Sequence, residues 1–218
     1  MRFNHVIMMC CIITACNKNI FNAGNPDFRV DAVGLELPQT PGWIKDTNIK
    51  VENNDLGGIV LRLIRVGGVV GSPRLDVVLE PLRGTPSNLD EYLTRNLREM
   101  ALLEEAGQLR ITKVEQESIQ QGDTRGYLVR HTYTLGKGGS QVALSQVSCF
   151  FVVSGRGVTV TAVGRSELFA PLANEIEKII RGIIFGVPGI SISHREKIAP
   201  ESDKVQEVPP EGKLPTGL

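Results

Sequence analysis

The heptapeptide Val147–Val153 (VSCFFVV) constrains the fold more than any other stretch of the chain. Its side chains do not alternate between apolar and polar, as those of a half-exposed strand would. A strand that is apolar on both faces has to be covered on both faces. The segment therefore predicts a sheet with a helix or a long loop packed against each side, and it argues against a bare barrel.

Two amphipathic segments supply the helices. The first begins after a capping residue at position 87 or 88, and its apolar residues recur at helical spacing until Gly107. The second runs from about Glu167 to Ile184, with Ser166 as a possible cap. Pro171 lies in its first turns, where a missing N–H costs least. Each apolar stripe needs a partner surface, so we expect one helix on each face of the sheet.

The segments between and around these helices have strand character and are joined by glycine-containing turns. They cover residues 33–38, 44–51, 59–66, 74–82, 110–119, 125–135, 141–153 and 158–164. The last four form an antiparallel meander. The sequence thus predicts an α+β fold, with a central antiparallel sheet of about six or seven strands flanked by helices.

The order of these pieces resembles the PsbP/Mog1/DcrB-like superfamily over residues 31–186. The resemblance is carried by the segments LELPQTPGW, SNLDEYL, VEQESIQQGDTRGYLVRHTYT, GVTVTAVGRSELFAPL and IEKIIRGIIF. It implies an α/β/α sandwich. It implies no catalytic residues, because this fold serves binding proteins, photosystem accessory subunits and secretion chaperones.

Residues 1–15 have the form of a secretory signal peptide: a short positive start and then an apolar run, Val6–Ala15. The run is far shorter than the roughly twenty residues that span a bilayer. A buried element of the domain is the alternative, but the loop-like residues that follow would leave it stranded. The sequence Ile13-Thr14-Ala15-Cys16 resembles the bacterial lipobox. That resemblance implies cleavage before Cys16, a diacylglycerol on its sulfur and commonly a third acyl chain on its amino group.

Two further segments flank the domain at 31–186. Residues 16–30 contain four Asn together with Gly24 and Pro26, and they predict a flexible tether that spans about 20 Å on average. Residues 187–218 combine several prolines with mixed charge and no aromatic residue, which predicts a disordered tail. A short partner-binding segment is the alternative for this tail. We expect the domain to be held at a membrane of the cell envelope, at the outer membrane or periplasmic face in a cell with two membranes.

Composition disfavours several kinds of partner. The sequence has 24 Lys+Arg and 24 Asp+Glu residues. Its basic residues form no stripe, which argues against a nucleic-acid partner. His131 is the only histidine of the predicted domain, so a His-based metal site is not expected, and no motif indicates a cofactor. The loop 67–72 is glycine-rich but lacks the lysine of a phosphate-binding P-loop and joins two strands.

His131 and Cys149 are the one candidate pair of base and nucleophile. If Leu135 faces Gln141 across the turn, the two side chains share a face but lie about 13 Å apart. Proton transfer needs about 3 Å. We therefore expect Cys149 to be a core thiol, and His131 to be a half-buried imidazole bonded to a neighbour.

Three other side chains invite a functional interpretation. Asp76 and Glu80 lie four apart on a strand beside Arg74 and Arg83, and we expect a solvated edge of mixed charge rather than a catalytic carboxylate pair. Trp43, the only tryptophan, is expected to cover one end of the core; if exposed, it would be a contact residue for a partner.

These observations predict a lipid-anchored, non-catalytic protein that serves as an adaptor or accessory subunit of an envelope protein complex. The alternative is a carrier or sensor of a small apolar ligand bound between helix and sheet. A cavity lined by the first helix would favour the carrier. A solid core with an exposed apolar patch would favour the adaptor. A cluster of polar side chains in a cleft would favour an enzyme.

Overall fold

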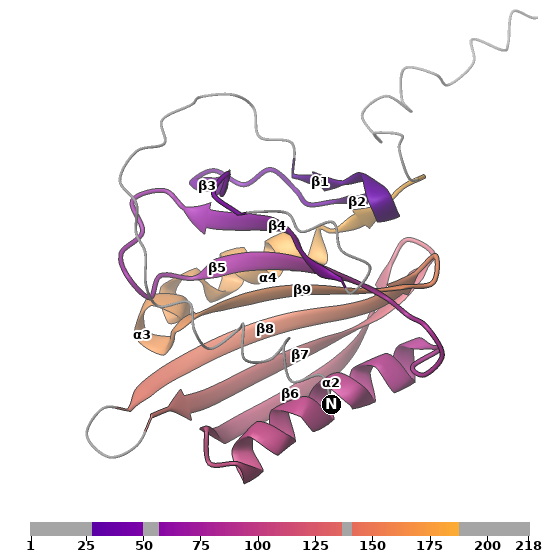
Figure 1. Ribbon diagram of the computed structural model, residues 1–218. Helices are drawn as coiled ribbons and strands as arrows, with labels where there is room; N and C mark the ends of the chain where they lie inside the picture. The colour runs from indigo at the N-terminus through magenta and orange to yellow at the C-terminus, as the bar shows by residue number, and fades with distance from the viewer. Residues whose placement is uncertain (1–27, 50–56, 137–140, 188–218) are drawn as a thin grey trace, which may run out of the picture.

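The computed structural model describes residues 28–49, 57–136 and 141–187. These form a seven-stranded antiparallel sheet in the order β3-β4-β5-β9-β8-β7-β6 and a three-stranded sheet in the order β1-β2-β10 (Figure 1). The strands of the large sheet are β3 (Trp43–Lys45), β4 (Gly58–Arg65), β5 (Arg74–Pro81), β6 (Leu109–Gln121), β7 (Thr124–Leu135), β8 (Val142–Val153) and β9 (Arg156–Arg165). Those of the small sheet are β1 (Arg29–Val30), β2 (Leu35–Glu36) and β10 (Ile184–Phe185). The predicted α+β fold is confirmed.

Helix α2 (Leu89–Glu105) begins where the sequence placed it. The side chain of Asn88 accepts a hydrogen bond of 3.0 Å from the backbone N–H of Glu91. In return, the Glu91 carboxylate accepts one of 2.7 Å from the N–H of Ser87. These reciprocal bonds satisfy donors that a helix start leaves unpaired, so they fix the first residue of α2.

The second predicted helix, 167–184, is wrong in its extent. It consists of α3 (Ser166–Phe169), the 3-10 turn η3 (Ala170–Leu172) and α4 (Ala173–Arg181). Pro171 lies in the 3-10 turn, because it offers no N–H to an α-helical bond there. Ser166 does not cap the helix; its hydroxyl accepts a hydrogen bond of 2.9 Å from the Ser145 hydroxyl instead.

The start of the domain also differs from the prediction. The expected strand 33–38 is reduced to β2, and the 3-10 turn η1 (Asp31–Val33) precedes it. Strand β1 lies in the stretch that the sequence assigned to the tether. Phe28 and Val30 are buried in the main core, and this burial explains why the chain is already ordered before residue 31.

Both faces of β8 are covered, as its sequence predicts. Cys149 and Phe151 pack into the main core with Ile176 and Ile180 of α4. On the opposite face, Phe150 packs with residues of α2. Figure 1 shows α2 on one side of the large sheet and α4 on the other. The molecule is therefore an α/β/α sandwich, and the small sheet extends its α4 side.

Candidate functional site

The turn between β4 and β5 exposes three valines within five residues. Val66 is 48% exposed, Val69 62% and Val70 50%. These are three of the seven large apolar side chains that are exposed in the described part of the chain. We call residues 66–71 the valine hairpin. An apolar group held in water at the tip of a hairpin is typical of a contact surface.

The valine hairpin is held in place by hydrogen bonds. The backbone N–H of Val69 donates to the Ser72 hydroxyl at 2.9 Å, and the N–H of Ser72 donates back to the Val69 carbonyl at 2.9 Å. The carbonyl of Gly71 accepts from the N–H of Arg165, at the end of β9, at 2.9 Å. The loop joins two strands, as the sequence predicts, and its valines are presented on a fixed backbone.

An open groove of about 300 Å³ lies beside this hairpin. Its lining residues are Gln141, Val142, Ala143, Arg165 and Glu167. A Cβ atom built at Gly71 would lie 2.7 Å from the side chain of Arg165, so hairpin and groove share a boundary. The Nε atom of Arg165 has no hydrogen-bond partner, and its ion pair with Glu167 is long, at 3.8 Å. The valine hairpin and the groove together form one surface, in which exposed apolar side chains lie beside a groove lined by Arg165.

A second groove, of about 570 Å³, opens at the amino end of α2. It is lined by residues of the helix start and of the turns that follow β6 and β8: Asn88, Leu89, Asp90, Asp123, Thr124, Arg125, Val152, Val153 and Ser154. The Asp90 carboxylate already accepts a hydrogen bond of 2.7 Å from the hydroxyl of Tyr127. Both grooves are open and carry charged groups, which is not the enclosed apolar space that a carrier of a small apolar ligand needs.

The surface of the sheet beneath α2 carries a row of bonded polar side chains. The Tyr133 hydroxyl donates to Gln146 at 3.1 Å, the Gln146 amide donates to Ser148 at 2.8 Å, and Ser148 is 2.9 Å from the Thr161 hydroxyl. All four residues are buried. Gln146 and Ser148 are two positions apart on β8, so their side chains lie on the same face of the strand. This polar spacing is the signal in the sequence that indicates the row. Because the row satisfies its own donors and acceptors, it acts as a structural network.

His131 lies next to this row and departs from the prediction. It is opposite Gln146 in the β7–β8 pairing, only 4% exposed, and its Nδ1 has no hydrogen-bond partner. The expectation of a half-buried, bonded imidazole is therefore wrong. The predicted register is also wrong, because Leu135 pairs with Val142 rather than with Gln141.

Because of this one-residue difference, the side chains of His131 and Cys149 do not share a face of the sheet, although the sequence predicted that they would. Cys149 pairs with Leu128, three positions along β7 from His131. Side chains three apart on a strand point to opposite faces. The thiol lies in the main core on the α4 side, and the imidazole lies on the α2 side. The two groups cannot act as a nucleophile and its base.

The buried imidazole makes domain stability depend on pH. Burial lowers the pKa of His131 below its ordinary value of 6.5, so the folded state resists a proton that the unfolded state accepts. We expect no His131 contribution above pH 6.5. Below it, stability should fall by up to about 1.4 kcal/mol per pH unit until the folded pKa is reached. Chemical unfolding across this range should show a shallower fall for His131→Gln; equal slopes in the two proteins would contradict the assignment.

The expected core residues are confirmed. Cys149 is fully buried, and desolvation raises the pKa of its thiol. Trp43 is also buried, and its indole N–H donates a hydrogen bond of 2.6 Å to Glu175 of α4. Trp43 therefore covers one end of the core, and it is not available as an exposed contact residue.

The expected solvated edge at Asp76 is wrong. Strand β5 lies third in the sheet, between β4 and β9, so the Asp76 side chain is only 7% exposed. Its carboxylate accepts from the Nε of Arg62 at 2.5 Å and from the Nε of Arg74 at 3.1 Å. Glu80 pairs instead with Arg95 of α2 at 2.5 Å. The two carboxylates serve separate ion pairs and do not form a catalytic pair.

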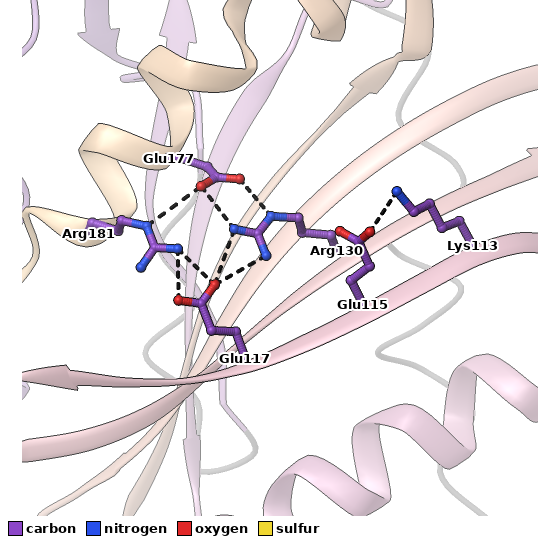
Figure 2. Close-up of polar contacts among 6 residues, drawn as sticks. All are labelled: Lys113, Glu115, Glu117, Arg130, Glu177 and Arg181. Carbon is purple, nitrogen blue, oxygen red and sulfur yellow. Dashed lines mark hydrogen bonds and ion pairs between the residues drawn. The ribbon is translucent and has the colours of Figure 1, made fainter.

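A second ion-pair cluster joins α4 to the edge of the large sheet (Figure 2). Arg130 of β7 donates to Glu177 of α4 at 2.6 and 2.9 Å, and Arg181 donates to Glu117 of β6 at 2.8 Å. These hydrogen bonds lower the pKa values of both carboxylates. The charges on β6 also discourage other strands from pairing with this exposed edge. Since the groups are partly solvated, their main effect is to fix α4 against the sheet.

Other candidate features were sought in the described ranges. Within them, no group of three or more His, Cys, Asp or Glu side chains is arranged to hold a metal ion. None of the helices described there has the length and apolar character needed to cross a membrane. The signal peptide 1–15, the lipidation site Cys16 and the tail from residue 188 onward lie outside the described residues.

Comparison with known proteins gives similarity in structure alone. No protein-family model and no curated protein matches the sequence. The solution structure of cyanobacterial PsbP (CyanoP) from Synechocystis sp. PCC 6803 matches with a TM-score of 0.54 and 11% identity, over 79% of this chain and 98% of that one. LpqN of Mycobacterium tuberculosis, described as involved in cell envelope biogenesis, gives a TM-score of 0.46 and 11% identity over 69% and 82%. The similarity to CyanoP, together with the strand order and the helix on each face, shows that this chain has a PsbP-like fold.

Proposed function

We propose that the protein is a lipid-anchored, non-catalytic adaptor or accessory subunit of a protein complex in the cell envelope. The observation that carries the proposal is the valine hairpin, which presents three exposed valines on a hydrogen-bonded turn. Removing these side chains from water is favourable. Because the turn is already ordered, a partner would lose little conformational freedom of the hairpin on binding.

The groove beside the hairpin supports a protein as the partner. Protein interfaces combine an apolar centre with a polar rim and are enriched in arginine. The hairpin supplies the apolar centre, and Arg165 and Glu167 supply polar groups next to it. Among the buried polar side chains, Gln146, Ser148 and Thr161 are hydrogen-bonded to one another and Asp76 is ion-paired with Arg62, so these four residues have a structural role.

The amino-terminal sequence supports the location. The apolar run before Cys16 and the Ile13-Thr14-Ala15-Cys16 motif resemble those of a lipidated, exported protein. Each buried methylene contributes about 0.8 kcal/mol, so two or three acyl chains on Cys16 would hold the protein firmly at a membrane. A tether that spans about 20 Å would keep the domain within reach of other envelope proteins.

Sedimentation of membrane extracts in mild detergent tests the adaptor role. We expect the native protein to sediment within an assembly larger than the monomer, and the variant Val69→Ser/Val70→Ser to sediment as a monomer. Val114→Ser is the matched control, because Val114 is 48% exposed on β6, away from the hairpin. The control should stay in the assembly. A native protein that sediments as a monomer, or a hairpin variant that remains assembled, would contradict the proposal.

A further inference from the structure

The small sheet is the place where the described chain begins and ends. The carbonyl of Phe28, the first described residue, accepts a hydrogen bond of 2.8 Å from the N–H of Leu37, just after β2. Strand β10 pairs with the other side of β2, with Ile184 opposite Glu36. The segment that leads to Cys16 and the carboxyl-terminal segment are therefore both joined to the domain at this sheet.

Two aliphatic side chains are exposed on the last described stretch of the chain, which includes β10. Ile184 is 44% exposed and Val187 39%. Between them, Phe185 points inward and packs edge-to-face against Phe151, with ring centroids 4.9 Å apart. The N–H of Gly186 donates a hydrogen bond of 2.7 Å to the carbonyl of Gly34. The exposed pair is therefore carried by a backbone that is fixed to the core.

The charged groups next to this pair carry no basic excess, because one arginine is paired with two carboxylates. Arg29 of β1 forms ion pairs with Asp31 at 2.6 Å and with Glu36 at 3.7 Å. A surface without a basic excess gains little from anionic lipid headgroups. Its contact with a membrane would rely on the aliphatic side chains, and should depend little on the lipid charge.

We propose that Ile184 and Val187 form a membrane-contact face that lies on the lipid interface when Cys16 is lipidated. This proposal rests on the lipid anchor of the proposed function. The stretch from Cys16 to Phe28 is about a dozen residues, and a flexible chain of that length would span about 20 Å on average. Such a short tether would give the small sheet a high local concentration at the membrane, which favours even a contact that buries only two aliphatic side chains. The contact orients the domain.

This orientation leaves the valine hairpin free for a partner. In Figure 1, β2 and the small sheet lie at the right, whereas the turn after the arrowhead of β4 lies at the left. A domain that rests on the membrane through Ile184 and Val187 holds the hairpin away from the tethered end. The anchored and the partner-binding ends of the molecule are thereby separated.

Depth measurement with a spin label tests the proposal. The full chain carrying Ile184→Cys is expressed so that it is processed and lipidated, then labelled with a nitroxide and placed in phosphatidylcholine vesicles. Cys149 is buried and should not react. Collision rates with oxygen, which concentrates in the membrane, and with a water-soluble nickel chelate report the depth of the label. Val69→Cys on the valine hairpin is the matched control, and circular dichroism checks that both variants are folded.

We expect the label at position 184 to collide mainly with oxygen and the label at position 69 mainly with the nickel chelate. Adding phosphatidylglycerol to the vesicles should leave both results unchanged. If the protein sediments with the vesicles but the label at 184 stays in water, the contact face is wrong while the lipid anchor stands. If the unlabelled protein does not sediment with the vesicles, the anchor is wrong and the contact face falls with it.

Discussion

Replacing Asp76 with asparagine should lower the free energy of unfolding by about 3–5 kcal/mol, because it removes the carboxylate that pairs with two largely buried guanidinium groups. Arg62 and Arg74 have side chains that are only 13% and 14% exposed. Burial already lowers the pKa of Arg74, although Asp76 lies beside it, which shows how strongly this site disfavours a bare charge. Urea unfolding followed by the fluorescence of Trp43 measures the loss.

Glu80→Gln is the matched control on the same strand. Its partner Arg95 and Glu80 itself are 32% and 24% exposed, so solvent screens the pair, and the expected loss is about 1 kcal/mol or less. An Asp76→Asn variant as stable as Glu80→Gln would show that the buried cluster contributes little. Replacing all three members of the cluster by apolar residues of similar volume should restore most of the stability.

The second large effect concerns location. Cys16→Ala should leave the protein uncleaved or misplaced in the envelope, because it removes the side chain that we propose receives the lipid. A cleaved chain without acyl chains would lose the groups that are proposed to hold it firmly at a membrane. Fractionation of cells into membrane and soluble parts, with immunodetection of the protein, measures the change. The fluorescence of Trp43 should be that of the native domain, since Cys16 lies outside the described core.

Cys149→Ala is the matched control, since it also removes one cysteine. Its thiol is buried in the main core, so this variant loses stability but should remain with the membranes. If mature Cys16→Ala protein, without residues 1–15, fractionates with membranes as the native protein does, the lipobox assignment is wrong. If both cysteine variants leave the membrane, the cause is loss of folding, and the result does not support lipidation at Cys16.

The overall fold could be predicted because it depends mainly on local patterns in the sequence. The apolar run of β8 requires cover on both faces, and the structure places α2 and α4 there. The capping residues of α2 and the glycine after it are local signals that no distant contact overrides. Pro171 is compatible with the first turns of a continuous helix, so the sequence does not predict the 3-10 turn in which it lies.

The details of the candidate sites could not be predicted, because they depend on which strands become neighbours. Asp76 looked like a surface carboxylate until β4 and β9 enclosed its strand. The pairing of β7 with β8 differs by one residue from the predicted pairing, and this difference places His131 and Cys149 on opposite faces of the sheet. The valine hairpin was visible as a glycine-rich loop, but the exposure of its side chains depends on the fold around it.

The central claim is that processing at Cys16 attaches a folded PsbP-like domain to an envelope membrane. Intact-mass spectrometry of the protein purified from its native cells tests this directly. The account predicts a chain that begins at Cys16 and carries the added mass of two or three acyl chains. A chain that begins at Met1 and carries no acyl mass would contradict it.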